Sequence, residues 1–240
     1  MLWLVAGMVL KAEAGPQSEA LNRDTLLSSD SLQRWSITLD YKLMQRDVKP
    51  DFAPVVELRA NTISGSLGYD PFRWLTIYAG AGTSEGKFQD IERYRSSRFS
   101  WATGLHAYLW NWESDREHKH GLRLFLDLDA EYARSESGSG DDVLTWSEIS
   151  AALPLKIELV PQHYNEIPID FYSMLFYAAP AVSMIDGTRS LSGRDVDFTE
   201  DRSVGFYAGA ELYVFKSFSL GARMEYFDTA TLKATARYHF

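Results

Sequence analysis

The chain has 240 residues, of which 45% are hydrophobic and 24% charged, a balance that excludes a disordered protein and indicates one domain, or at most two. The net charge of −9 argues against a nucleic-acid-binding protein, and the absence of cysteine excludes disulfides, thiolate metal sites and a catalytic thiol. No apolar run approaches the ~20 residues of a membrane-spanning helix. Helical membrane proteins are therefore excluded, whereas a transmembrane β-barrel, whose signal is alternation, is not.

Residues 1–14 look like a secretory signal peptide. The apolar stretch 2–10 precedes Ala12-Glu13-Ala14, a small-x-small cleavage pattern that makes Gly15 the first mature residue. No Lys or Arg precedes the stretch, and a buried strand or helix is the alternative interpretation. Residues 15–34 are polar with spaced leucines. We expect them to form a solvated periplasmic segment, and insertion into a lumen is the alternative.

From residue 35 onward, apolar and polar residues alternate in segments of about ten residues, which is typical of half-exposed β-strands. In the clearest segment, 122–132, four leucines alternate with Arg123, Phe125, Asp127 and Asp129. Residues 171–184 are apolar on both faces, and residues 55–67 change phase, which predicts a β-bulge near Ser64 or Gly65. The pattern predicts ten strands, with eight or twelve as alternatives, at residues 35–46, 54–68, 74–84, 97–111, 121–135, 143–159, 170–184, 203–215, 218–227 and 230–240.

The last predicted strand carries the most specific pattern. Apolar residues from Ala230 to Phe240 share one face, and Lys233, Arg237 and His239 share the other. The strand ends on Tyr238 and Phe240, and in this respect it resembles the last strand of bacterial outer-membrane β-barrels. In that family the terminal aromatic residue is part of the signal read by the assembly machinery.

This resemblance implies a closed antiparallel up-and-down transmembrane β-barrel over residues 35–240, with both termini in the periplasm. Long polar segments at 47–53, 85–96, 136–142 and 185–202 are then outer loops. The aromatic residues fall at the strand ends, as expected for two interfacial girdles. The inner girdle comprises Trp35, Trp74, Trp110, Trp112, Tyr172, Phe215, Phe218, Tyr238 and Phe240, and the outer girdle Phe99, Trp101, Tyr132, Trp146, Phe206 and Tyr226.

Charged residues on the opposite face of these strands are predicted to face the lumen. They are Asp40, Lys42, Arg59, Arg123, Asp127, Asp129, Glu131, Glu148, Lys156, Glu158, Glu211, Arg223, Glu225, Lys233 and Arg237. Because a ten-strand lumen is narrow, the mixed charges are expected to pair and to close it. The alternative is a narrow pore, in which the acidic triplet Asp127, Asp129 and Glu131 favours cations.

The sequence shows no catalytic constellation. The outer-membrane hydrolases rely on a histidine at the outer rim as general base, whereas His106, His118, His120, His163 and His239 fall in the inner half or in inner turns. A metal at His118-x-His120 is an alternative to a solvated turn. Calcium at Asp195, Asp197, Glu200 and Asp201 is an alternative to a solvated acidic loop. We therefore expect no catalytic residues, no metal and no cofactor.

The predicted function is that of a small, non-enzymatic barrel of a Gram-negative outer membrane, with a structural or surface-interaction role. A narrow, porin-like, cation-leaning channel is the alternative, and an outer-membrane hydrolase is a third hypothesis. The partners that this predicts are membrane lipid, lipopolysaccharide and, through the C-terminal strand, the barrel assembly machinery. The sequence does not identify an extracellular partner.

Overall fold

The computed structural model describes the chain except for residues 1–33, 52–53, 89–95, 114–119, 162–171 and 192. The signal peptide and the segment predicted before residue 34 lie outside the described residues. Among the described residues, no helix is both long enough and apolar enough to cross a bilayer.

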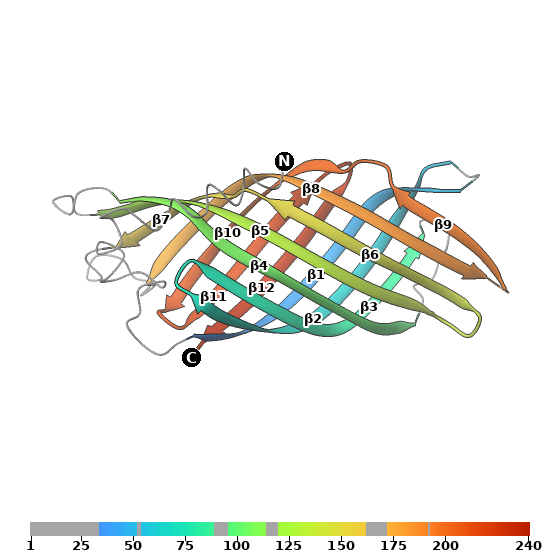
Figure 1. Ribbon diagram of the computed structural model, residues 1–240, viewed down its shortest axis with the longest axis horizontal. Helices are drawn as coiled ribbons and strands as arrows, with labels where there is room; N and C mark the ends of the chain where they lie inside the picture. The colour runs from blue at the N-terminus through green and yellow to red at the C-terminus, as the bar shows by residue number, and fades with distance from the viewer. Residues whose placement is uncertain (1–33, 52–53, 89–95, 114–119, 162–171, 192) are drawn as a thin grey trace.

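The described residues form twelve antiparallel strands (Figure 1). They are β1 (Trp35–Pro50), β2 (Val56–Phe72), β3 (Leu75–Phe88), β4 (Ser97–Glu113), β5 (His120–Ser139), β6 (Asp142–Ala152), β7 (Leu155–Pro161), β8 (Ser173–Leu191), β9 (Arg194–Glu200), β10 (Val204–Phe215), β11 (Phe218–Tyr226) and β12 (Ala230–His239).

The strands close into a barrel whose wall has ten positions. Most strands pair with their neighbours in the chain, β10 pairs with β8, and β12 pairs with β1 from Ser36↔His239 to Leu43↔Leu232. Strands β6 and β7 occupy one position, because both pair with β5 and β8 and are separated only at Leu153 and Pro154. Proline has no N–H for the ladder, which interrupts the strand there. The predicted fold class, a closed antiparallel barrel, is confirmed.

The outside of the barrel carries a continuous apolar band. Ile37 and Leu39 on β1, Ile63 on β2 and Met184 on β8 are each about half exposed or more. Exposed aromatic residues mark one end of the band (Trp35, Phe72, Trp74, Trp110, Trp112, Phe215 and Tyr238) and the other (Phe99, Trp101, Phe206 and Tyr226). Such a band with aromatic borders suits the hydrocarbon core of a bilayer and its two interfaces.

We call the end of the barrel at which Trp35 and Phe240 exchange backbone hydrogen bonds the near end. The opposite end, with the β5–β6 turn and the β8–β9 hairpin, is the far end and lies at the right of Figure 1. A register shift between Tyr108 and Trp110 changes the phase of β4, so Trp110 and Trp112 face outward at the near end although Phe99 and Trp101, at odd positions, face outward earlier on the strand.

Beyond the apolar band, towards the far end, the two faces of the wall exchange polarity. On β2, Ile63 is 62% exposed within the band, whereas Leu58 is fully buried inside the barrel. The predicted bulge near Ser64 is wrong, because β1 and β2 pair without a shift from Trp35↔Tyr69 to Val48↔Val56. The predicted outward face of residues 56–60 is therefore the inward face.

The inward apolar residues of the far end form one cluster, which we call the far-end core. It consists of Met44, Val48, Leu58, Ala60, Phe88, Leu144, Trp146, Ile185 and Phe198. Trp146 was predicted in the outer girdle, and this is wrong, since its side chain is 4% exposed and lies inside the barrel. Above a membrane the outside of the wall meets water, so apolar residues are stabilised only on the inside.

The segment predicted as an outer loop at 185–202 is a hairpin instead. Strand β8 continues to Leu191, and β9 returns beside it to Glu200, with Gly193 at the turn in the left-handed region (φ 79°). The C-terminal end of β9 also pairs with β1, from Pro50↔Phe198 to Val48↔Glu200. Strand β9 thus enters the wall between β8 and β1 and places Phe198 in the far-end core.

Candidate functional site

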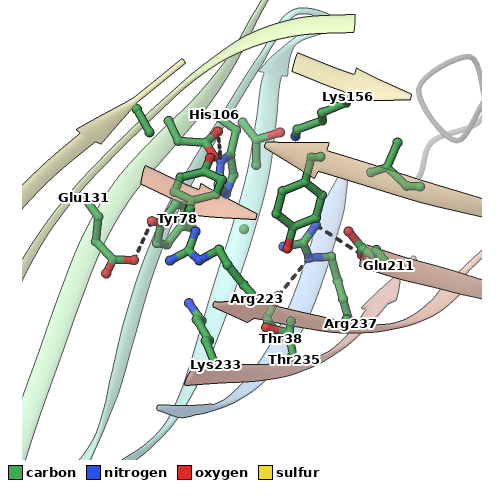
Figure 2. A pocket seen from close by; sticks show the side chains of 18 of the residues that line it. Thr38, Tyr78, His106, Glu131, Lys156, Glu211, Arg223, Lys233, Thr235 and Arg237 are labelled. Carbon is green, nitrogen blue, oxygen red and sulfur yellow. Dashed lines mark hydrogen bonds and ion pairs between the residues drawn. The ribbon is translucent and has the colours of Figure 1, made fainter. Parts of the chain in front are cut away.

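The lumen contains a polar cavity of about 210 Å³ in the part of the barrel enclosed by the apolar band. Its lining extends from Ser36, Asp70 and His239 near the chain ends to Phe227 beneath the far-end core. The side chains come from strands on opposite sides of the barrel, and Figure 2 shows Arg223, Lys233 and Arg237 facing the wall that carries Tyr78 and Glu131.

The structure places fourteen of the fifteen charged residues predicted for the lumen inside the barrel. Ten line the cavity: Asp40, Asp129, Glu131, Lys156, Glu158, Glu211, Arg223, Glu225, Lys233 and Arg237. The other four are Lys42, Glu148, Arg123 and Asp127. Lys42 and Glu148 pair with each other at 2.7 Å, whereas Arg123 pairs with the lining residue Glu158 at 3.5 Å and Asp127 with the lining residue Lys156 at 2.5 Å.

Arg59 is the exception. Its neighbours Leu58 and Ala60 point into the barrel, so Arg59 lies on the outer face, where its side chain is 36% exposed and pairs with Glu57. The prediction for Arg59 is wrong because it assumed a change of phase on β2 that the structure does not contain.

Each member of the acidic triplet on β5 has a defined partner. Lys156 binds Asp127, and His106 Nδ1 lies 2.8 Å from Asp129. The hydroxyl groups of two tyrosines complete the arrangement, Tyr207 donating to Asp129 at 2.6 Å and Tyr78 donating to Glu131 at 2.7 Å. The sequence predicted the acidic side chains on this face, but not the tyrosines, because alternation does not say which strands face each other across a lumen.

A second cluster of charges lies beside the far-end core. Arg46 is completely buried, with Glu225 at 3.3 Å, Glu200 at 3.7 Å and Glu148 at 3.9 Å. The guanidinium also stacks 3.8 Å from the centre of the Phe227 ring. The sequence analysis missed Arg46, although its position, two residues after Met44, continues the inward series of β1 and was a usable signal.

Glu200 was predicted within a solvated acidic loop or as a calcium ligand, and both interpretations disagree with its position. Its side chain is 2% exposed and faces Arg46. Burial raises the pKa of Glu200 to about 7, and Arg46 opposes this shift. The other acidic residues of the hairpin bind hydroxyl groups, Asp195 with Ser190 at 2.6 Å and Asp197 with Thr188 at 2.7 Å.

The histidines do not assemble a hydrolytic site among the described residues. His106 lies in the lumen beside Asp129, and His239 lies at the near-end rim of the cavity. His118 and His163 lie outside the described residues, as does the side chain of His120. Within the described part of the chain, no three His, Cys, Asp or Glu residues are arranged to hold a metal ion.

No protein-family model and no curated protein matches this sequence. Among solved structures, the barrel is similar to the transport unit of the autotransporter AIDA-I from Escherichia coli (11% identity, 89% and 92% of the two chains, TM-score 0.42). It is also similar to the translocator domain of the autotransporter NalP from Neisseria meningitidis (13%, 98% and 95%, 0.34) and to the outer membrane protease OmpT from Escherichia coli (9%, 89% and 100%, 0.32).

Proposed function

We propose that this protein is a bacterial outer-membrane β-barrel with a closed lumen and a structural or surface-interaction role. The observation that carries the proposal is the far-end core, because tightly packed apolar side chains from six strands occupy the lumen where a pore needs water. Beside it, Arg46 and three carboxylates occupy a further part of the lumen.

The fold supports a specific orientation. The even number of wall positions brings both ends of the barrel chain to the near end, which we assign to the periplasm. The apolar band then contacts membrane lipid, and the far end, with its polar outer face, reaches lipopolysaccharide and the cell exterior. We assign Tyr238 and Phe240, which stack with ring centres 6.3 Å apart on the outside, to recognition by the assembly machinery.

The surface role falls to the far-end hairpins. The tip of the β8–β9 hairpin presents Arg194, Asp195 and Val196 outside the barrel, while Phe198 and Glu200 of the same strand stay buried. A partner of the cell surface can therefore contact the tip without disturbing the closure of the lumen. This proposal assigns no catalytic step to the barrel.

Conductance tests the proposal directly. The full chain would be refolded into detergent micelles, its folding verified by a heat-dependent gel shift, and its current recorded across a planar bilayer. We expect no discrete current steps from folded protein. Cation-selective steps whose selectivity changes in the variant Asp129→Asn would contradict closure and favour the narrow channel.

A further inference from the structure

The lumen cavity has more acidic than basic side chains. Its described lining includes seven carboxylates and four Lys or Arg residues, besides two histidines. Each of the four cations already has a carboxylate close by: Lys156 has Asp127 at 2.5 Å, Arg223 has Glu225 at 2.5 Å, Lys233 has Asp40 at 3.4 Å and Arg237 has Glu211 at 3.7 Å. Each basic side chain of the lining thus already forms an ion pair, and an anionic ligand would have to displace the carboxylate of that pair.

Two lining carboxylates are held differently. Asp129 binds His106 and Tyr207, and Glu131 binds Tyr78, so their closest partners are an imidazole and two neutral hydroxyl groups. The two side chains are on the same face of β5, about 7 Å apart along the strand. Protein cations act on the pair only at longer range, Lys42, Lys233 and Arg223 on Glu131 and Lys156 on Asp129, since each of these four is closest to another carboxylate. Negative charge in an enclosed site is costly unless a cation accompanies it.

Aromatic rings surround this carboxylate pair. The Tyr78 ring stacks on His106 with centres 5.2 Å apart, and Tyr177 meets Tyr207 edge to face at 5.9 Å. The guanidinium of Arg223 lies 4.8 Å from the centre of the Tyr207 ring, so one organic cation, supplied by the protein itself, is already bound to this wall. Ring faces attract soft, weakly hydrated cations such as quaternary ammonium and guanidinium groups.

We propose that the cavity binds a small organic cation of the ammonium or guanidinium class, with its charge between Asp129 and Glu131 and its apolar part against Tyr78 and Tyr207. A cavity volume of about 210 Å³ limits the ligand to a small molecule. The ring-lined wall favours an organic cation over a metal ion, and the described residues contain no metal-type cluster. This inference does not depend on whether the far end is closed.

The test uses choline as the probe and the full chain refolded in a nonionic maltoside detergent, since detergents with choline or amine-oxide head groups would compete. Isothermal titration calorimetry would compare choline with 3,3-dimethylbutan-1-ol, its uncharged isostere. We expect saturable binding of choline, at least tenfold weaker binding of the isostere, and at least a tenfold loss of choline affinity in Asp129→Asn/Glu131→Gln. The matched control is Asp195→Asn/Asp197→Asn on the β8–β9 hairpin, which should bind choline like the wild type.

The outcomes separate the explanations. Equal binding of choline and its isostere, or no binding of choline by folded wild-type protein, would overturn the proposal, and neither result requires a variant to fold. Complete displacement of choline by equimolar K⁺ or Mg²⁺ would show a site for inorganic counter-ions and would also overturn it. A conducting wild-type barrel that still binds choline would contradict the closed lumen but not this site.

Discussion

Arg46 joins three carboxylates from three different strands, Glu148 of β6, Glu200 of β9 and Glu225 of β11. Lys42 and Arg223 bind two of these carboxylates from the side of the cavity, so the cluster alternates in sign. A buried charge is tolerated when it is paired in this way, and removing Arg46 takes away the cation that faces Glu200 and one of the two cations at Glu148 and at Glu225. The far end is therefore more sensitive to a change at Arg46 than to a change at an exposed arginine.

Replacing this residue should destabilise the barrel strongly. In Arg46→Met the chain keeps a side chain of similar length, but Glu148 and Glu225 lose their shared cation, and we expect a loss of about 3–5 kcal/mol. Urea unfolding of the micelle-bound protein, followed by tryptophan fluorescence, measures it. Arg59→Met removes a partly exposed arginine of the outer face, which pairs with Glu57, and should change stability by less than about 1 kcal/mol. Equal losses in both variants would contradict the burial of Arg46.

Glu200 should make stability depend on pH. The folded protein keeps the Glu200 proton up to about pH 7, whereas an ordinary glutamate releases it near 4.5. Between these values the folded state binds more protons, so the contribution of Glu200 is greatest below about pH 4.5 and is lost as pH rises to about 7. The loss amounts to at most about 3 kcal/mol.

The variant Glu200→Gln isolates this contribution. It cannot ionise, so its free energy of unfolding should decrease less than that of the wild type between pH 5 and pH 8. Urea midpoints measured in parallel across this range give the comparison. Parallel pH profiles for the two proteins would show that Glu200 titrates normally.

At the scale of the element, β2 shows why apolar residues alone do not define the outside of a barrel. On β2 up to residue 67, the apolar residues before about residue 61 occupy even positions and those after it odd positions. If all of them faced lipid, a bulge between the two sets would be the simplest explanation. The structure keeps one register throughout, with Leu58 and Ala60 inside above the membrane and Ile63 outside within it. The medium outside the strand changes from lipid to water along its length, while the register of the strand stays the same.

Cysteine labelling distinguishes these descriptions, because the chain has no cysteine of its own. Leu58→Cys should be unreactive towards a membrane-impermeant maleimide, and Arg59→Cys should react readily. Ile63→Cys should react only with a lipid-soluble maleimide. Mass spectrometry of the folded protein in lipid vesicles reports all three. Labelling at position 58 together with protection at position 59 would contradict the continuous register and support a bulge in β2.

For the whole molecule, the far end is built like a water-soluble barrel and the band beneath it like a membrane barrel. Strand β9 completes the far end by pairing with both β8 and β1, and Phe198 packs edge to face on Phe88 with ring centres 5.4 Å apart. The closure that we propose for the lumen is thus a property of the assembled barrel, because six strands contribute to the far-end core.

Removing the two largest aromatic side chains of the far-end core should open a water path. We expect discrete current steps in a planar bilayer from Trp146→Ala/Phe198→Ala, in contrast to a silent wild type, because the truncation removes much of the packed volume. The control, Phe99→Ala/Trp101→Ala, truncates outward-facing aromatics and should stay silent. Silence of the folded core variant would mean that the Arg46 cluster closes the lumen without the core.

The strand positions and most of the lumen-facing charges are predictable from alternation, because side chains of a strand point to opposite faces at every step. The site is less accessible to such reasoning. Tyr78, Tyr207 and His106 contact Asp129 and Glu131 through positions 23 to 78 residues away in the chain, and local periodicity contains no information on that pairing. The acidic neighbours Asp195 and Asp197 predict a solvated position for Glu200, whereas the pairing of β9 with β1 buries its side chain.

Alternation in the sequence predicts a series of antiparallel strands with one apolar and one polar face, and the resemblance of the last strand to outer-membrane barrels implies that these strands close into a barrel. Only the tertiary structure decides that β9 enters the wall, that Trp146 and Leu58 turn inward, and that Arg46 meets Glu148, Glu200 and Glu225. Those outcomes depend on which strands meet across the lumen and on where the membrane ends along each strand, and neither is encoded in the local period of the chain.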